Sequence, residues 1–399
     1  MSQPSADLPL SALRVLDCAS YIAGPAAATV LSDFGADVIK IEPPEGDPFR
    51  RLVPGVSYPW DLDSRNKRSL SLDLKRPEGI AVLHRLLATT DVFITNLPLP
   101  ARRRLGIDAH TLCAAFPRLI YASMTAYGES GDEADKTGFD ATAYWARSGL
   151  ADLVKADHTS APTRSVTGMG DHPSAMALYG AIMTALYLRE RSGRGGEVRS
   201  SLMANGLWAN GSFAQAALNG TPPPLRAPRE QAPNPIANIY QCADGRWINI
   251  TILNERQFPA LCEALERPEL AGDPRFATAD ARAIHHDALI AVFDQRFVSM
   301  PLAHWRERLD AVGITFSLIG SLADLATDAQ MRAVGALLPY AEGEGLTVNS
   351  PIELVGRPKR VPSRAPETVG RDSRLVLSEA GFTPAEIDAL CESGTVCQS

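Results

Sequence analysis

The stretch from Leu13 to Ile41, LRVLDCASYIAGPAAATVLSDFGADVIKI, decides the fold class of this chain. It begins with an apolar run that ends before a Gly24-Pro25 break, and Ala26–Phe34 then has the composition of a helix. Gly35 separates this helix from a second apolar run, Asp37–Ile41. A strand, a helix and a second strand in this order predict the beginning of a parallel α/β sheet.

The same alternation continues along the chain. Ser69–Leu74 has alternating apolar positions, and Pro77 then starts a predicted helix that runs to about Thr90. Asp91–Asn96 and Leu119–Thr125 are further apolar strands. The first two hundred residues therefore predict an open, mainly parallel α/β sheet.

The longest predicted helix runs from about Ser174 to Arg191 and ends at the glycine-rich segment 192–196. Asp171 stands just before it, between Gly170 and Pro173. A helix N-terminus favours an anion, so this position is expected to lower the pKa of Asp171. The local sequence alone is explained equally well by a plain helix cap.

The run TPPPLRAP at 221–228 predicts a linker that divides the molecule. We assign 1–215 to the first part of a large domain, 216–232 to the linker, and 233–325 to a smaller α+β domain that contains a hairpin around Asp244-Gly245. Residues 326–399 form a linker and a C-terminal segment, with a capped helix that begins at Thr383-Pro384.

Composition excludes several classes of protein. The chain has 399 residues, is 45% hydrophobic and 21% charged, and carries a formal charge of −7, which disfavours a general nucleic-acid binder. The six cysteines form no C-x-x-C pair, and the segment 1–10 lacks the features of a signal peptide. No window approaches 18 uninterrupted apolar residues, so we expect a cytoplasmic protein that does not enter the membrane.

Common catalytic motifs of serine hydrolases, zinc proteases, P-loop enzymes and dinucleotide-binding enzymes are absent. His285-His286 could supply metal ligands, but adjacent helical residues point about 100° apart, which favours a solvated helix surface. We therefore predict no metal site. The run Arg102–Arg104 could bind phosphate after the strand that ends at Asn96, or it could be a solvated helix face.

Taken together, the motifs resemble those of class III coenzyme A transferases, also called the CaiB/BaiF family. The resemblance is carried in order by Leu16-Asp17, Ala23–Pro25, Asp33–Pro44, Asn66–Ser69, Leu72–Lys75, Asp91–Asn96, Gly138–Asp140, Gly170-Asp171, Arg189–Gly195, Asn234-Pro235 and Asp244–Trp247. It implies an interlocked homodimer, in which each large Rossmann-like domain is built from both ends of the sequence and a smaller domain is inserted between them.

The resemblance also implies a mechanism, with Asp171 as the nucleophile. Its carboxylate would attack an acyl-CoA thioester to give a mixed anhydride, and the released thiolate would convert this into an aspartyl-CoA thioester. An acceptor carboxylic acid would then reverse the steps. The N–H groups of Gly168, Met169 or Gly170 could stabilise the oxyanions. CoA would be a substrate, and no tightly bound cofactor is expected.

The family pattern also places the contacts with CoA, among which Arg104 is the predicted phosphate ligand. The other predicted contacts are Tyr21, Ile22, Ala23, Leu72, Asn96, Leu97, Leu105 and Phe139. At the last position transferases usually have tyrosine, and Phe139 supplies the ring without the hydroxyl. Some relatives for very small acyl groups carry glutamine where Tyr21-Ile22 stands in this chain.

Three alternatives stay open. A racemase of the same family would need a histidine where Phe139 stands, with His172 or His158 as substitutes. A non-catalytic CoA-binding protein would tolerate loss of Asp171. Tyr144, Trp145 and Met169 could line a pocket for a medium, branched or aromatic acyl group, or they could pack in the core.

Overall fold

The computed structural model describes residues 8–52, 57–221, 223 and 225–397. Two of the sequence predictions concern segments that lie partly outside these described ranges. The absence of a signal peptide concerns a segment of which 1–7 lie outside the described residues, and so do Pro222 and Pro224 of the predicted linker.

The described chain divides into two compact units. The large unit comprises Met1–Ala151, Arg164–Ala214 and Ala329–Ser399, and the small unit comprises Asp152–Thr163 and Gln215–Asp328. Residues 152–163, which the sequence prediction includes in the range 1–215, belong to the small unit by their contacts. The N–H of His158, for example, donates to the carbonyl of Arg226 at 2.8 Å.

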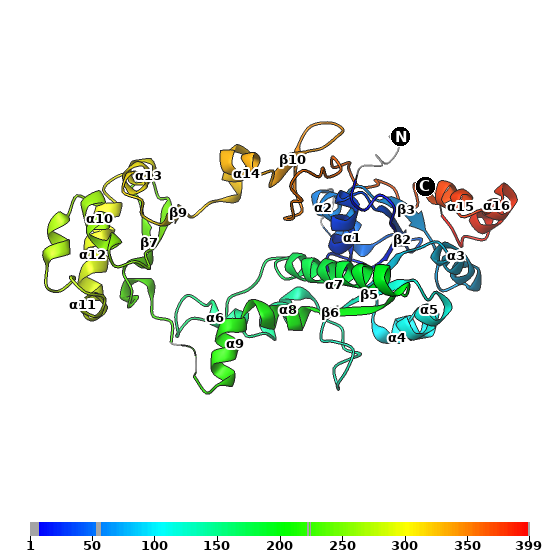
Figure 1. Cartoon of the computed structure of the whole chain (residues 1–399), viewed down its shortest axis with the longest axis horizontal. Helices are drawn as coiled ribbons and strands as arrows, with labels where there is room; N and C mark the ends of the chain where they lie inside the picture. The colour runs from blue at the N-terminus through cyan, green and yellow to red at the C-terminus, as the bar shows by residue number, and fades with distance from the viewer. Residues whose placement is uncertain (1–7, 53–56, 222, 224, 398–399) are drawn as a thin grey trace. The chain divides into compact units, whose positions relative to one another are not determined.

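A six-stranded sheet forms the centre of the large unit (Figure 1). All its pairs are parallel, and the strand order is β3-β2-β1-β4-β5-β6. The strands are β1 Arg14–Cys18, β2 Asp37–Glu42, β3 Arg68–Ser71, β4 Val92–Thr95, β5 Ile120–Thr125 and β6 Gly196–Ser201. The predicted parallel α/β sheet is confirmed. Its order reverses between β1 and β4, and ligands of such sheets bind beyond the strand ends at that point.

Both faces of this sheet are covered by helices, and successive strand residues serve opposite faces. Val15 packs toward one face and Leu16 toward the other. The helices on the first face are α1 Ala23–Asp33 and α7 Asp171–Ser192, and those on the second are α3 Pro77–Leu87, α5 Ala109–Ala115, α15 Ser373–Glu379 and α16 Pro384–Glu392. The C-terminal helices thus pack against a sheet whose strands all lie between Arg14 and Ser201.

The other elements of the large unit are short. They are η1 Pro48–Arg51, α2 Tyr58–Ser64, α4 Leu99–Leu105, the π-helix η2 Asp140–Ala146, α8 Leu202–Ala209, α14 Ala329–Ala333, and an antiparallel pair of β10 Leu337–Pro339 and β11 Leu346–Val348. Two helices, α6 Leu150–Leu153 and α9 Gly211–Leu218, cross the boundary between the units in sequence.

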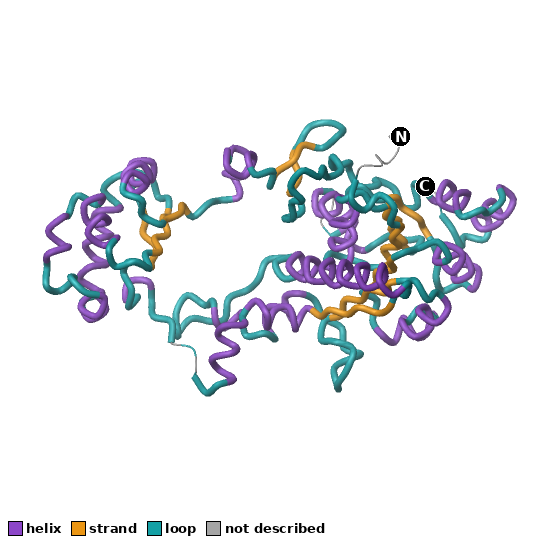
Figure 2. The backbone as a smooth tube through the Cα atoms, viewed as in Figure 1, coloured by secondary structure: helices purple, strands orange, loops and turns teal. Residues whose placement is uncertain are grey.

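The small unit has its own core around a three-stranded antiparallel sheet (Figure 2). The predicted hairpin is confirmed, with β7 Ala237–Gln241 pairing with β8 Trp247–Thr251, and β9 Phe316–Leu318 completes the sheet. The helical elements are η3 Arg229–Gln231, α10 Gln257–Ala264, η4 Pro268–Gly272, α11 Ala279–Ile284, α12 His286–Phe297, α13 Leu302–Ala311 and η5 Leu322–Thr327. Trp305 is fully buried in this core.

Two further features follow from the described helices. No helix in the described ranges is at once long enough and apolar enough to cross a bilayer. The predicted capping box at the start of α16 is confirmed, because Thr383 caps the N–H of Glu386 and the Glu386 carboxylate accepts from Thr383.

Candidate active site

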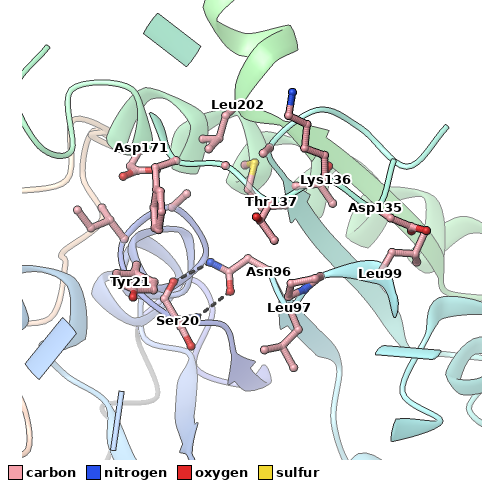
Figure 3. Close-up of a pocket in the computed structure, with 18 of the residues that line it drawn as sticks. Ser20, Tyr21, Asn96, Leu97, Leu99, Asp135, Lys136, Thr137, Asp171 and Leu202 are labelled. Carbon is pink, nitrogen blue, oxygen red and sulfur yellow. Dashed lines mark hydrogen bonds between the residues drawn. The ribbon is translucent and has the colours of Figure 1, made fainter. Parts of the chain in front are cut away.

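A cavity of about 460 Å³ lies in the large unit beyond the carboxyl ends of β1, β4 and β5 (Figure 3). This is the place where the strand order reverses. Its lining residues are Ser20–Ala23 after β1, Asn96–Leu99 after β4, Met124–Ala126 at the end of β5, Ala134–Phe139, Asp171 and Leu202. The volume is within the range of small-molecule sites, about 300–1,000 Å³.

The structure brings most of the predicted site residues together at this cavity. Those that line it are Tyr21, Ile22, Ala23, Asn96, Leu97, Phe139 and Asp171. Three do not: Leu72 is buried in the core on the second face of the sheet, Leu105 packs against that core, and Arg104 is exposed on α4. The lining positions come from four separate segments of the sequence.

The turn between β1 and α1 is held in an unusual conformation. Tyr21 has a φ of 62°, in the left-handed region that non-glycine residues seldom adopt. Its N–H donates to Asp47 at 3.3 Å, and its ring meets Phe139 edge to face with centroids 5.6 Å apart. Asn96 closes the turn from the side of β4, since its amide both donates to and accepts from the backbone of Ser20 (Figure 3).

A buried network of ion pairs holds the turn between β1 and α1 in place. The Lys40 ammonium lies 2.9 Å from a carboxylate oxygen of Asp47 and also donates to the carbonyl of Ala19. The Lys67 ammonium lies 2.8 Å from Asp17 and donates to the carbonyl of Pro25. Because these charges are removed from water, each needs its partner, and the pairs tie β1, β2 and the start of α1 to one another.

At the start of α7 the backbone of Gly170 packs closely against the ring of Tyr144. A Cβ added to Gly170 would lie 2.5 Å from the ring carbon Cγ of Tyr144, so this position has no room for a side chain. The N–H of Gly170 donates to the Asp140 carboxylate at 3.2 Å. These contacts bring the first residue of α7, Asp171, to the edge of the cavity.

Asp171 differs from the sequence prediction in two respects. It is the first helical residue, with Gly170 at the cap position and no side-chain cap bond, so the cap interpretation is wrong. Burial, reinforced by the negative charge of Asp140, raises the pKa of Asp171 to about 7, whereas the helix terminus alone predicted a lowered pKa. Desolvation and the nearby carboxylates raise the pKa of Asp171 by more than the helix dipole lowers it.

His172 is fixed by two hydrogen bonds. Its Nε2 lies 3.0 Å from a carboxylate oxygen of Asp63, and its Nδ1 lies 3.1 Å from the carbonyl oxygen of Gly168. Burial opposes the charged ring, but the bond and the charge of Asp63 raise the pKa of His172 above its usual value. Asp63 is not among the residues predicted from sequence, because nothing in the local sequence connects residue 63 with residue 172.

Two of the three predicted oxyanion donors are already engaged. The N–H of Met169 donates to the carbonyl of Val166, and that of Gly170 to Asp140. Gly168, with a φ of 83°, turns the chain into α7. Its N–H forms no hydrogen bond within the described part of the chain, so it is the one of the three that is free to act.

The basic residues around the cavity have distinct surroundings. Arg102 is fully buried with its guanidinium 2.8 Å from Glu129, so it is no solvated helix residue. Arg104 is exposed and makes no ion pair among the described residues. Lys136 lines the cavity, with its ammonium 4.9 Å from the centre of the Tyr127 ring. Lys136 was not predicted from sequence, since it stands in a polar loop without a motif.

The remaining candidates from the sequence lie elsewhere. Tyr144 and Trp145 are buried, with Tyr144 in the core, whereas Met169 is 46% exposed. His286 lies 2.9 Å from Asp287 at the start of α12 in the small unit. In the described ranges no group of three or more His, Cys, Asp or Glu residues is arranged to hold a metal ion. The six cysteines are free.

Comparison with known proteins gives a consistent result. The family model described as CoA-transferase family III matches residues 10–373. A (R)-2-hydroxy-4-methylpentanoate CoA-transferase of Clostridioides difficile is 31% identical over 399 residues, covering 97% of this chain and 99% of the relative. A cinnamoyl-CoA:phenyllactate CoA-transferase of Clostridium sporogenes is 32% identical, with 95% of each chain covered.

A solved structure shares the fold. The crystal structure of a CaiB/BaiF family protein from Brucella suis superposes with a TM-score of 0.84 and 29% sequence identity. The match covers 94% of this chain and 100% of that chain.

Proposed function

Because the chain belongs to CoA-transferase family III, we propose that this enzyme moves coenzyme A from an acyl-CoA to a carboxylic acid with Asp171 as its nucleophile. The observation that supports the proposal most directly is the position of Asp171 in the structure. It is a carboxylate at the edge of the cavity, and with a pKa of about 7 it is about half ionised at pH 7 and mostly ionised at higher pH. Asp171 is partly removed from water and forms no salt bridge with the described residues, and such a carboxylate is suited to attack a thioester.

The proposed reaction is balanced in bonds and charge. A carboxylate oxygen of Asp171 attacks the thioester carbonyl, the carbon–sulfur bond breaks, and CoA thiolate leaves a mixed anhydride. The thiolate then attacks the side-chain carbonyl of Asp171, which releases the donor acid as its carboxylate and leaves an aspartyl-CoA thioester. An acceptor carboxylate repeats both steps in reverse order. No proton, water or redox partner is consumed.

The cavity favours substrates with an apolar tail. Leu97, Met124, Leu202 and Phe139 contribute apolar side chains to its lining. Two of the relatives, those compared above, are named for acids with apolar tails, branched in one and aromatic in the other. We therefore propose a medium-sized carboxylic acid with a branched aliphatic or aromatic tail as the acceptor.

The racemase alternative has no comparable support. Phe139 occupies the position at the cavity where that mechanism needs a base, and a phenyl ring moves no proton. Both ring nitrogens of His172 are engaged by Asp63 and Gly168, so this histidine is not free to replace it.

A homodimer is also part of the proposal. Its support is the set of large apolar side chains that a single chain leaves exposed, including Trp208 at 86%, Leu218 at 80% and Leu225 at 82%. Burying such side chains against a second copy would remove them from water. The cytoplasmic location stays a prediction.

The test is an acyl-exchange assay with a panel of acyl-CoA donors and acids of increasing tail size. Asp171→Asn should lower the transfer rate by at least about a thousandfold, since an amide is not a nucleophile for this step. The matched control is Asp108→Asn, which changes an aspartate that caps α5 away from the cavity and keeps a capping group. Transfer by Asp171→Asn at the wild-type rate would contradict the proposal.

A further inference from the structure

The hydrogen bonds of His172 determine its charge. Its two partners are the carbonyl oxygen of Gly168 and a carboxylate oxygen of Asp63, at 3.1 and 3.0 Å. A carbonyl and an ionised carboxylate only accept hydrogen bonds, so both ring nitrogens must donate. Only the imidazolium carries a proton on both nitrogens. The geometry therefore indicates a cation at the residue that directly follows the proposed nucleophile.

Asp63 is fixed in a position that allows its contact with His172. It lies in α2 and is 2% exposed, and within the described residues its carboxylate bonds to no side chain except His172. Its backbone carbonyl accepts from Thr29 and from the buried ammonium of Lys67, which fixes the end of α2. A buried carboxylate without a cationic partner is costly, and the contact with Asp63 favours the charged form of His172.

Among the described residues, His172 is the cation whose charge acts on the Asp171 carboxylate. The three carboxylates that bear on this site are Asp171 itself, Asp140 from η2 and Asp63 from α2. Arg65, which lies near His172, is paired with Asp33 of α1 at 2.7 Å.

The C-terminal segment beside His172 is uncharged but binds one cation, Lys359. The His172 side chain borders a second cavity of about 530 Å³, where the C-terminal segment Val348–Pro351 contributes only uncharged side chains. Lys359 donates to Asn349 and Ser350 of that segment. The His172 side chain is 45% exposed, so its ring can exchange protons with solvent while its two bonds hold it in place.

We propose that Asp63 and His172 form a positioning pair in which Asp63 keeps the ring of His172 protonated and the resulting cation keeps Asp171 ionised for attack. The pair rests on the proposed function of Asp171 and deepens it, since it names the residues that set the charge of the nucleophile. The cation partly offsets the repulsion that Asp140 and Asp63 exert on Asp171.

The first test measures the charge of His172 without reference to activity. The ring signals of the seven histidines are followed by NMR across the pH range in the full-length protein, and the His172 signal is assigned by its loss in His172→Gln. The wild-type midpoint should lie above the ordinary value of 6.5. In Asp63→Asn it should fall by about one pH unit or more, because the carboxylate partner is gone. An unchanged midpoint in Asp63→Asn would overturn the pair.

The second test measures the effect on the nucleophile. His172→Gln keeps a donor for Asp63 but carries no charge, so the acid limb of kcat/KM for the acyl-CoA should move up by about one pH unit. The rate would then be about tenfold below wild type at pH 6 and within about twofold at pH 9.

The matched control is His286→Gln in the small unit. That histidine also has two acceptors, with Nδ1 at 2.8 Å from the Ala283 carbonyl and Nε2 at 2.9 Å from Asp287. The pH profile of His286→Gln should superimpose on that of the wild-type enzyme. A His172→Gln profile that is lowered equally at every pH would overturn the proposal, since it would indicate a purely structural role.

The outcomes separate this inference from the proposed function. If the wild-type enzyme transfers CoA but the His172→Gln profile is not shifted, only the positioning pair fails. If Asp171→Asn retains full transfer, the proposed function fails, whereas the NMR titration still decides whether Asp63 holds the charge of His172. A thermal melt of each variant confirms that it is folded before either test is scored.

Discussion

Asp171 owes its properties to residues that are distant in sequence. The helix terminus on which it stands favours an anion, but burial and the charge of Asp140 act in the opposite direction and prevail. His172, which follows directly, reduces this effect through its bond to Asp63. The reactivity of a single carboxylate is therefore determined by three elements, η2, α2 and α7, rather than by its own helix.

The raised pKa has a consequence for stability. Ionising Asp171 is harder in the folded chain than in the unfolded chain, so its contribution to stability is present at low pH and is lost as the pH rises from about 4 through about 7. Asp171→Asn removes this loss and should raise the Tm by about 1–3 °C at pH 8.

The difference in Tm should shrink as the pH is lowered through 7 toward 4. Scanning calorimetry of the two proteins at matched pH values measures it. A variant that melts below wild type at pH 8 would show that the Asp171 carboxylate stabilises the fold, which is the opposite of the effect expected from its raised pKa.

At the scale of elements, the site depends on how β1, α1, α2 and α7 are joined. Lys67 contacts three of them, since it pairs with Asp17 at the end of β1 and donates to the carbonyls of Pro25 in α1 and Asp63 in α2. A single buried ammonium thus joins the end of β1, the start of α1 and the segment that carries Asp63.

Lys67→Met should therefore destabilise the large unit strongly. The substitution leaves Asp17 buried with only the more distant Lys40, 4.0 Å away, and the expected loss is about 3 kcal/mol of unfolding free energy. Lys155→Met is the control, because Lys155 forms an ion pair with an exposed partner, Asp152, and should cost less than about 0.5 kcal/mol. Denaturant melts measure both. Equal effects would contradict the role assigned to Lys67.

The glycine at the start of α7 allows a second comparison within one helix. Gly170→Ala would place a Cβ 2.5 Å from the Tyr144 ring and should displace Asp171, so we expect kcat to fall by about a hundredfold. Gly180→Ala meets nothing within 4 Å and should stabilise the helix by about 0.5–1 kcal/mol with normal activity. Normal kcat in Gly170→Ala would show that this close approach does not position the nucleophile.

At the scale of the whole molecule, the sequence predicted what depends on local pattern. The alternation of apolar runs with helical segments predicted the parallel sheet, and Asp244-Gly245 predicted the hairpin of the small unit. The site residues were taken from the resemblance to the family, and most of them line one cavity because the segments after β1 and β4 end at one edge of the sheet. The contacts of Asp63, Lys136 and residues 152–163 could not be predicted, because each depends on tertiary packing that leaves no periodic signal.

The predicted homodimer can be measured directly. Light scattering coupled to gel filtration should give twice the chain mass at micromolar concentration. Trp208→Ser, which removes an apolar side chain that is 86% exposed in the single chain, should weaken the association if α8 lies in the interface. A monomer mass for the wild-type protein at every concentration would contradict the dimer.

The proposed transfer depends above all on a covalent bond that forms at Asp171. Intact-protein mass spectrometry after mixing with an acyl-CoA, with hydroxylamine or borohydride trapping and peptide mapping, detects that bond. We expect a modified peptide that contains Asp171, present with productive donors and absent in Asp171→Asn. Turnover of an acyl-CoA without any adduct on that peptide, or with the adduct on another residue, would contradict the mechanism.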